Sequence, residues 1–587
     1  MSFSEEYLKE HTQDLWIEYK KGVDYNRLKG VYEATEKNYN FYHGKQWEGA
    51  KLGDIEPTVQ NIIKPIVKYK LGVINQNHYE ITFNPQAYST IEEGKDLTEL
   101  CKVLDRYTAK VWENQKADQK VREATKDSCI NDEGIIHNYY DVDKKQIVPE
   151  VIDKNNIYYG NENSPDIETQ PYIIITYRQP VTEVLKEAET KYNLTQEELE
   201  LILPDEETQE QAGYDSTSDE VNDMCLIILK YYKKDGKVYY DRATKYVELE
   251  KEKSTELTRY PVAHMNWEKV KGYSRGVGAV NCIIPNQIEI NRIDARRCLS
   301  VQLGAFQRLV YNEDMITNPE ALKKIGGAIK IKGGASVDDV RNAIGYISPS
   351  SMSADASNLS TEMKTNTREL EGAGDDATGH VDPTKASGRA ILAVQQANQQ
   401  PLSEQVENYK EFVEDIARIW FDMWKAYEVN GLSIVYEEKD STGSVVEIPG
   451  EIPYERLQTL EPNIKVDITP HSPYDRYAQE QSLENLFMTD KITFEEYVEA
   501  LPEGSVMPKT VLEQIIKKRK EHEEQITAMQ MEANAMQSAM NQVMSQEGGN
   551  NGMSTMQVGG NGGQVPGQQQ NNLSMQEMSA GGYNQQG

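Results

Sequence analysis

The longest amphipathic segment of the chain, Ser387 to Tyr427, constrains the fold more than any other feature. Apolar and aromatic side chains recur in its second half at unbroken steps of three and four. This spacing places them on one helical stripe, which must be buried against another part of the fold. Pro401 removes a backbone donor, so the helix is predicted to bend there. The stripe comprises Val406, Tyr409, Phe412, Val413, Ile416, Ile419, Trp420, Met423, Trp424 and Tyr427.

A second long helix is predicted from Pro285 to Arg308. Its apolar residues fall on two sides, which indicates a helix contacted from two directions. Glu289 with Arg292, and Asp294 with Arg297, have the i to i+3 spacing of surface ion pairs. One side carries Ile284, Ile288, Ala295, Leu299 and Phe306, and the other carries Ile290, Ile293 and Val301.

The rest of the chain mixes helical and β-rich patterns, which predicts an α+β fold. The first 80 residues are helical in pattern, with a polar break at HGKQWEG, and residues 134–178 are β-rich. Asp235-Gly236 lies between two apolar runs, 225–232 and 237–241, as in a β-hairpin. The carboxylate-rich stretch 185–223 is predicted to be a solvated acidic excursion or mobile loop.

Composition excludes several classes of protein. The 587 residues allow about two to four domains. Ninety-five acidic residues against 63 basic ones give a formal charge of −32, which argues against tight sequence-independent binding to nucleic acid. The acidic N-terminus and the lack of an 18-residue apolar run predict neither export nor a membrane span. The five scattered cysteines are predicted to be reduced core thiols.

Two catalytic signatures are missing from the sequence. It contains no GxxxxGK[ST] or HExxH motif, so NTPase and metalloprotease functions lack support. Asp375, Asp376, His380 and Asp382 supply enough ligands for a divalent metal in principle. They sit on a single Gly-flanked loop beside Pro383, whereas metal sites usually draw on separate rigid elements. We therefore predict no catalytic residue, metal or cofactor, and a polar loop here.

The order of segments after the second helix is distinctive. A compact αβ insert is followed by a returning helix, a loop rich in Gly and Asp, and the long bent helix; a hairpin, a strand and further helices come next. From residue 528 onward there is no Lys or Arg, and the tail lacks the apolar β-branched residues that a packed core needs, so it is predicted to be disordered. The ranges are 309–352, 353–370, 371–385, 387–427, 432–448, 464–469 and 473–524.

This order, together with FQRLVYN and SGRAILAVQQANQQPLSEQVENYKEFVEDIARIWFDMW, resembles the portal protein of tailed bacteriophages, of the type found in phages of Gram-positive hosts. The segments YHGKQW and QNIIKPIVKYKLGVI are similar to the start of that family. The resemblance covers Tyr42 to about Lys520, and its most specific part is SGRA at the start of the long helix. The acidic stretch and the tail depart from the family pattern.

The resemblance implies a ring subunit, usually one of twelve, at one capsid vertex through which double-stranded DNA is packaged and ejected. It implies a wing, two stem helices, a clip, a tunnel loop and a crown. By residue number these are the N-terminal portion of the wing (1–280), a stem helix (281–308), a clip (309–352), a stem helix (353–370), a tunnel loop (371–386), a wing helix and hairpin (387–472), a crown (473–527) and a disordered tail (528–587).

The resemblance implies three groups of site residues. The DNA-facing tunnel loop would use Gly374, Asp375, Asp376, Thr378, Gly379, His380, Asp382 and Lys385. The partner-facing clip would use Lys323, Lys324, Lys330, Lys332 and Arg341. Packing between neighbouring stems would use Ile288, Ile290, Leu299, Val301 and Phe306.

The implied partners are further copies of the chain, DNA, the packaging motor (terminase), a head-tail adaptor, and the major capsid and scaffold proteins. No membrane is implied; the location is the virion, after assembly in the host cytoplasm. Two physical points agree with this hypothesis. A helix with apolar residues on two sides suits a ring with a neighbour on each flank, and carboxylates let a duplex slide. A metal-dependent nuclease or packaging enzyme using Asp375, Asp376 and Asp382, or another head-tail subunit such as an adaptor, is the alternative.

Overall fold

The computed structural model describes residues 12–51, 56–86, 90–204 except 193, 223–374 with short gaps between 306 and 353, and 400–470 except 440–444. It also describes residues 482–501 except 490 and scattered positions from 511 to 536. The chain divides into two compact units, Met1–Asp475 and Arg476–Gly587. No helix in the described residues is long and apolar enough to cross a membrane.

Helices begin the first unit, as the sequence predicts. They are α2 (Asp14–Leu28), α3 (Val31–His43), α4 (Ile63–Asn75), α5 (Ile91–Asn114) and α6 (Ala117–Asn131). Gly44 ends α3 with a φ of +90°, a left-handed conformation that favours glycine. The predicted polar break is therefore a helix terminus. The turn after it is held by Gln46, whose side-chain amide donates to the Phe41 carbonyl at 2.9 Å.

Two antiparallel sheets follow these helices. The three-stranded sheet has the order β3 (Gln146–Ile152), β2 (Glu133–Asp141), β9 (Val262–Asn266). The five-stranded sheet runs β4 (Ile157–Tyr159), β5 (Tyr172–Pro180), β6 (Met224–Lys234), β7 (Lys237–Ala243), β8 (Glu248–Ser254). Asp235 and Gly236 join β6 to β7 with φ of +53° and +79°, as a two-residue hairpin turn of the primed type requires. The hairpin prediction is confirmed.

The acidic stretch is only partly what the sequence predicts. It contains α7 (Val181–Glu187), a π-turn Ala188–Tyr192 and α8 (Gln196–Glu200), which begins with a capping box between Thr195 and Glu198. Its apolar residues bury themselves in a small separate core, so a solvated excursion is the wrong description of residues 185–202. Residues 205–222 lie outside the described part of the chain. That core comprises Val184, Ala188, Leu199, Leu201, Ile202, Cys225, Ile227, Val247 and Leu249.

The main core forms around α13 (Ser403–Tyr427), whose apolar stripe is buried as predicted. This helix packs on β9, on β2 and on β14 (Pro462–Pro470), which pairs with β1 (Asn77–Pro85). Trp420 is fully buried and donates from its indole nitrogen to the Asn138 side-chain oxygen at 2.8 Å. Pro401 lies in a 3₁₀ turn, Gln400–Leu402, before the helix, and residues 387–399 lie outside the described residues. The predicted bend is therefore untested.

A hairpin and a short helix complete the first unit after α13. Strands β12 (Leu432–Lys439) and β13 (Val445–Ile452) pair antiparallel, which confirms the predicted hairpin. The helix α14 (Tyr454–Thr459) then leads to β14. Gly431, with a φ of +78°, starts the hairpin where a Cβ would lie only 2.3 Å from the Ile452 carbonyl oxygen.

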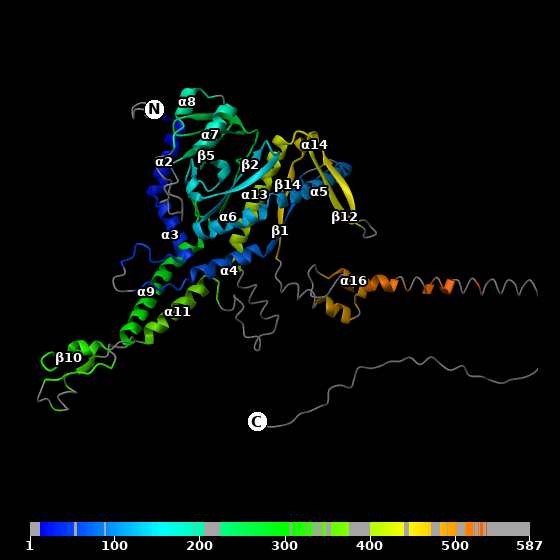
Figure 1. Ribbon diagram of the computed structural model, residues 1–587. Coiled ribbons are helices and arrows are strands. Elements are labelled where there is room, and N and C mark those ends of the chain that lie inside the picture. Colours follow the sequence, from blue (N-terminus) through cyan, green and yellow to red (C-terminus); the bar gives the residue numbers. More distant parts are fainter. Residues whose placement is uncertain are drawn as a thin grey trace, which may run out of the picture. The chain divides into compact units, whose positions relative to one another are not determined.

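Two helices, α9 (Ala279–Ala305) and α11 (Ala354–Leu370), run side by side with a small insert between them in the sequence (Figure 1). The helix α9 begins six residues before the predicted start at Pro285, which lies inside it. The insert contains β10 (Arg308–Tyr311) and β11 (Ile344–Ile347), paired antiparallel, and a 3₁₀ turn Pro319–Lys323. Residues 309–352 thus have the mixed content that the sequence predicts.

Cysteine burial is mixed. All five cysteines are free thiols, and Cys101, Cys129 and Cys225 are buried as predicted. Cys282 and Cys298 are exposed on α9. The prediction of five core thiols is therefore wrong for these two, because they lie on sides of α9 that its neighbours leave uncovered.

The second unit has a small apolar core of its own. It includes α16 (Phe494–Glu499), which begins with a capping box between Thr493 and Glu496. Tyr497, Val498 and Leu501 are buried there against Leu483, Phe487 and Ile492. The predicted helical character of this region is confirmed for the described residues. Residues 541–587 lie outside them.

Candidate functional site

The contact between α9 and α11 is centred on Asp294. Its carboxylate accepts a hydrogen bond from the Ser360 hydroxyl at 2.7 Å and pairs with the Lys364 ammonium at 2.7 Å. The predicted pair between Asp294 and Arg297 is therefore wrong, because Asp294 faces α11. The other predicted pair is confirmed: Arg292 donates to Glu289 at 3.0 Å on the exposed side of α9. A buried charge-assisted contact of this kind fixes how the two helices meet.

The first half of α9 is held to the N-terminal segments by a chain of hydrogen bonds between polar side chains and the backbone. Gln287 accepts from the Ile62 backbone N–H at 2.9 Å and donates to the Gln60 carbonyl at 3.0 Å. It also donates to Asn291 at 2.9 Å, and Asn291 donates to Gln46 at 2.6 Å. Gln46 and Gln60 belong to the segments YHGKQW and QNIIKPIV. These segments therefore fix the position of the helix pair.

The five predicted stem-packing residues differ in exposure. Ile290 is completely buried inside the subunit, so it has no surface left for a neighbour to cover. Ile288 is half-buried against the main core, and Leu299 is half-buried. Val301 is 65% exposed. Phe306 lies outside the described residues.

The predicted tunnel loop has a fixed starting point. The ammonium of Lys70 on α4 pairs with the Glu371 carboxylate at 2.5 Å, and both side chains are largely buried. Gly372 takes a φ of +71°, and the Ala373 backbone N–H donates to the Arg368 carbonyl at 2.8 Å. Ala373 is then buried in the main core. This left-handed cap ends α11 and anchors the first residue of the loop.

Only the beginning of that loop is described. Gly374 is the last described residue before 400. Asp375, Asp376, Thr378, Gly379, His380, Asp382 and Lys385 lie outside the described residues. Within the portion of the chain that is described, no group of three or more His, Cys, Asp or Glu side chains has the arrangement to hold a metal ion.

The insert presents cationic side chains on a backbone that is locally fixed. The Lys330 N–H donates to the Asn318 side-chain oxygen at 2.6 Å, and the Lys332 N–H donates to the Met315 carbonyl at 3.0 Å. Lys324, Lys330 and Lys332 are all exposed. The Lys323 side chain and all of Arg341 lie outside the described residues. Three of the five predicted cations are thus available to a partner of opposite charge.

A buried ionic network joins the sheets near the start of α9. Arg275 and Glu133 are both inaccessible to solvent and form an ion pair. Glu133 also accepts from Tyr159 at 3.2 Å and contacts the His264 ring at 2.9 Å. Burial by itself would raise the pKa of Glu133, but Arg275 and His264 outweigh it and hold the pKa at about 2. Glu133 is therefore a carboxylate at neutral pH.

The same network continues to the first turn of α9. Lys154 pairs with Asp132 at 2.8 Å, and Asp132 accepts from the Gly278 backbone N–H and the Asn281 side chain, each at 3.1 Å. Asp132 has a φ of +85°, a strained conformation that these three bonds hold in place. Sequence reasoning missed the network. The sequence offers one hint of this network, the two glycines in SRGVG. In the structure, the second of them, Gly278, is required because a Cβ there would lie 2.9 Å from the Asp132 nitrogen.

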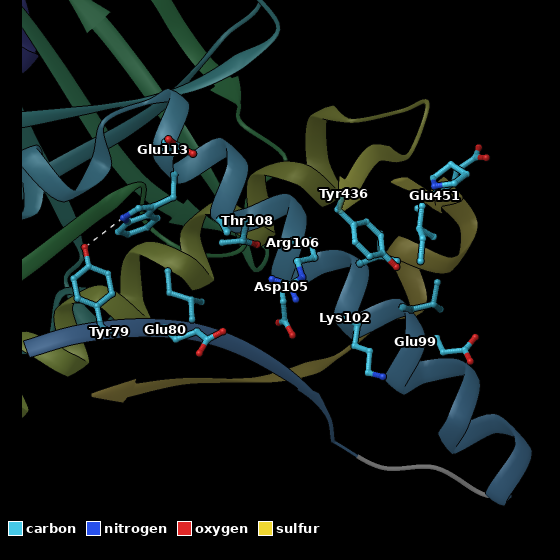
Figure 2. A pocket seen from close by; sticks show the side chains of 18 of the residues that line it. Tyr79, Glu80, Glu99, Lys102, Asp105, Arg106, Thr108, Glu113, Tyr436 and Glu451 are labelled. Atoms are coloured by element: carbon cyan, nitrogen blue, oxygen red, sulfur yellow. Dashed lines mark hydrogen bonds between the residues drawn. The ribbon is translucent and has the colours of Figure 1, made fainter. Parts of the chain in front are cut away.

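An open groove of about 1060 Å³ lies between α5, β1 and the β12–β13 hairpin (Figure 2). Glu80, Glu99, Asp105, Glu113 and Glu451 line it, among other residues. Burial raises the pKa of Asp105 to about 6, although its carboxylate accepts from the Phe83 N–H at 2.7 Å. The groove was not predicted, since its walls come from segments more than 300 residues apart.

Comparison with known families identifies the chain. The family model for phage P22-like portal proteins matches residues 23–558. The chain belongs to the phage P22-like portal protein family. The match includes the helix pair, the insert and the predicted loop of this portal protein. A search of curated proteins finds no match.

The family assignment confirms the resemblance read from the sequence, and with it the α+β portal fold and the portal function. Portal proteins form homo-oligomeric rings at a capsid vertex and act with DNA, capsid and terminase in DNA packaging. They are generally structural proteins. That this portal protein comes from a phage of a Gram-positive host stays a prediction.

Proposed function

We propose that twelve copies of this portal protein form a conduit for double-stranded DNA that carries out no chemistry of its own. In this proposal α9 and α11 are the stem, residues 309–352 are the clip, and residues 371–386 are the tunnel loop. The wing comprises residues 1–280 and 387–472, the crown 473–527, and the tail 528–587. The clip docks first the terminase and then the head-tail adaptor, and assembly with scaffold and major capsid protein takes place in the host cytoplasm of a Gram-positive bacterium.

One observation carries the proposal. The helices α9 and α11 pack together and are bridged by Asp294, with the insert at one end and the anchored loop start, Glu371 to Ala373, at the other. A ring of such pairs would present inserts to a partner on one side and loops inside the channel. The net charge of −32 favours passage of DNA, because carboxylates repel phosphates and prevent tight binding.

The conduit is tested on purified rings. Wild-type protein should appear as a hollow ring in negative-stain images, and linear DNA incubated with it and Mg²⁺ or Mn²⁺ should stay intact. Asp375→Ala/Asp376→Ala should assemble equally well and leave the DNA equally intact, because we expect no metal site in the loop. Cleavage by wild type that disappears in the variant would establish a nuclease instead. Packaging that fails in the variant without cleavage in either protein would place the loop in DNA translocation.

Charge reversal in the insert tests the proposed clip. Lys330→Glu/Lys332→Glu should weaken binding of the terminase or adaptor roughly tenfold at low salt, because a partner with an acidic edge is attracted to these exposed lysines. Rings should still form, since both backbones are held by Asn318 and Met315 rather than by the lysine side chains. The measurement is equilibrium binding of the purified partner to rings.

The matched control reverses Lys144 and Lys145, two exposed lysines in the turn between β2 and β3. The double substitution Lys144→Glu/Lys145→Glu should leave partner binding unchanged. Equal binding by both reversed proteins at physiological salt would mean that the lysines of the insert are only a solvated surface.

A further inference from the structure

The two outward faces of the helix pair carry opposite charges. On α9, the residues Pro285, Glu289, Arg292 and Arg296 follow one another at steps of four, three and four and form a single stripe. At 100° per residue this stripe lies on the far side of the helix from Asp294, which faces α11. Arg292 and Arg296 are both exposed there. Glu289 is the partner of Arg292.

The outward face of α11 is acidic. Asp355, Glu362 and Glu369 recur at steps of seven, which is close to two helical turns, and all three are exposed. They lie opposite Ser360 and Thr367, the buried residues that contact α9 through Asp294 and Asn286. The exposed neighbours of the stripe are uncharged: Asn358, Thr365 and Asn366. Lys364, a basic residue of the same helix, is turned toward Asp294.

We infer that the basic stripe of α9, centred on Arg292 and Arg296, packs against the acidic stripe of α11, centred on Glu362 and Glu369, in the next copy of the chain. This inference rests on the proposed ring. Different faces on opposite sides of one helix pair give a heterologous contact, which is the kind that closes into a ring. Complementary charge sets the register and selects the correct neighbour.

Apolar residues beside the stripes add contact area. Leu299 lies half-buried next to the basic stripe, and Leu359 and Leu370 lie beside the acidic stripe, 48% and 82% exposed. Exposed leucines on an isolated helix pair gain from burial against a neighbour. A channel-facing position of the acidic stripe would leave the leucines in contact with water and DNA, and for this reason we favour the neighbouring subunit as the occupant.

Reversal and exchange of the charges test the inference. Arg292→Glu/Arg296→Glu and Glu362→Arg/Glu369→Arg should each raise the protomer concentration for half-maximal ring assembly at least about tenfold, because like charges then meet across every contact. Combining all four substitutions in one chain restores opposite charges at every contact and should return this concentration to within about threefold of wild type. Analytical ultracentrifugation measures assembly, at about 50 mM and about 500 mM salt, where screening should reduce both effects.

Matched controls separate assembly from folding. Lys37→Glu/Lys110→Glu reverses two exposed lysines on α3 and α5 and should assemble like wild type. Far-UV circular dichroism and thermal midpoints of the protomers should be unchanged in all variants.

Normal assembly by both reversed proteins, or no rescue in the fourfold variant, would overturn the inference. Normal assembly of Glu362→Arg/Glu369→Arg with slowed DNA passage would place the acidic stripe in the channel. A wild-type protein that forms no ring would instead refute the proposed function.

Discussion

Replacing Arg275 by Met is expected to lower the free energy of unfolding of the first unit by about 3–5 kcal/mol. The guanidinium is the main counter-charge of Glu133, and both side chains are inaccessible to solvent. It also donates to the Ile157 carbonyl at 3.1 Å. Met fills a similar volume but leaves the Glu133 carboxylate buried without its main counter-charge, with the Tyr159 and His264 contacts and the more distant Lys154 remaining. Removal of one member of a buried pair costs much more than the net value of the pair.

The measurement is the denaturation midpoint of wild type and Arg275→Met, with Arg27→Met as the control. Arg27 is exposed and lies 3.8 Å from Asp24, so its loss should cost less than about 1 kcal/mol. If Arg275→Met were no more destabilising than the control, the network would have no structural role. The double variant Arg275→Met/Glu133→Leu should lose less than the sum of its single variants, because the unpaired carboxylate is gone.

The Arg275 effect should depend on pH. In the folded protein the pKa of Glu133 lies at about 2, below its ordinary 4.5. A lowered folded pKa gives stability that is present above the ordinary pKa and lost as the pH falls through the folded one. The difference between wild type and Arg275→Met should therefore shrink between about pH 4.5 and pH 2. A difference that stays constant over this window would contradict the pairing.

Elements with a strong local pattern could be predicted from the sequence. The apolar stripe of α13 and the Asp235-Gly236 hairpin depend on neighbours within a few residues, and both are confirmed. The prediction of a solvated loop failed for the acidic stretch because it was based on average composition. Single apolar residues in the stretch, such as Val184 and Leu199, are buried in a small core. Average charge reports solvation of a segment and not the burial of its individual side chains.

Contacts between distant segments could not be predicted. Asp294 and Arg297 have the i to i+3 spacing of an ion pair. In the structure, however, the Asp294 carboxylate binds Lys364 and Ser360, which lie on the helix that follows the insert. Glu133 and Arg275 are likewise far apart in the sequence. The order of helix, insert, helix and loop could be predicted from the sequence. The helix faces that contact one another could not be predicted, because they depend on tertiary packing.

Replacing Asp127 by Asn is expected to stabilise the protein by about 2–4 kcal/mol at pH 8 and by less than half as much at pH 5. Burial, together with the nearby carboxylates of Asp153 and Glu123, raises the pKa of Asp127 to about 7, against a smaller lowering by Lys126. The folded protein therefore holds a proton that the unfolded chain, with an ordinary pKa of 3.8, releases. Stability falls as the pH rises from about 4 to 7, and Asn removes this loss.

Thermal midpoints at pH 5 and pH 8 test this expectation, with Asp143→Asn as the control. Asp143 is exposed in the turn after β2, so its substitution should leave the difference between the two pH values unchanged. The upper end of the expected range follows from about three pKa units at about 1.4 kcal/mol each, and partial contact of Asp127 with water reduces it. A gain of equal size at both pH values would mean that packing of the amide, and not removal of a buried charge, stabilises the variant.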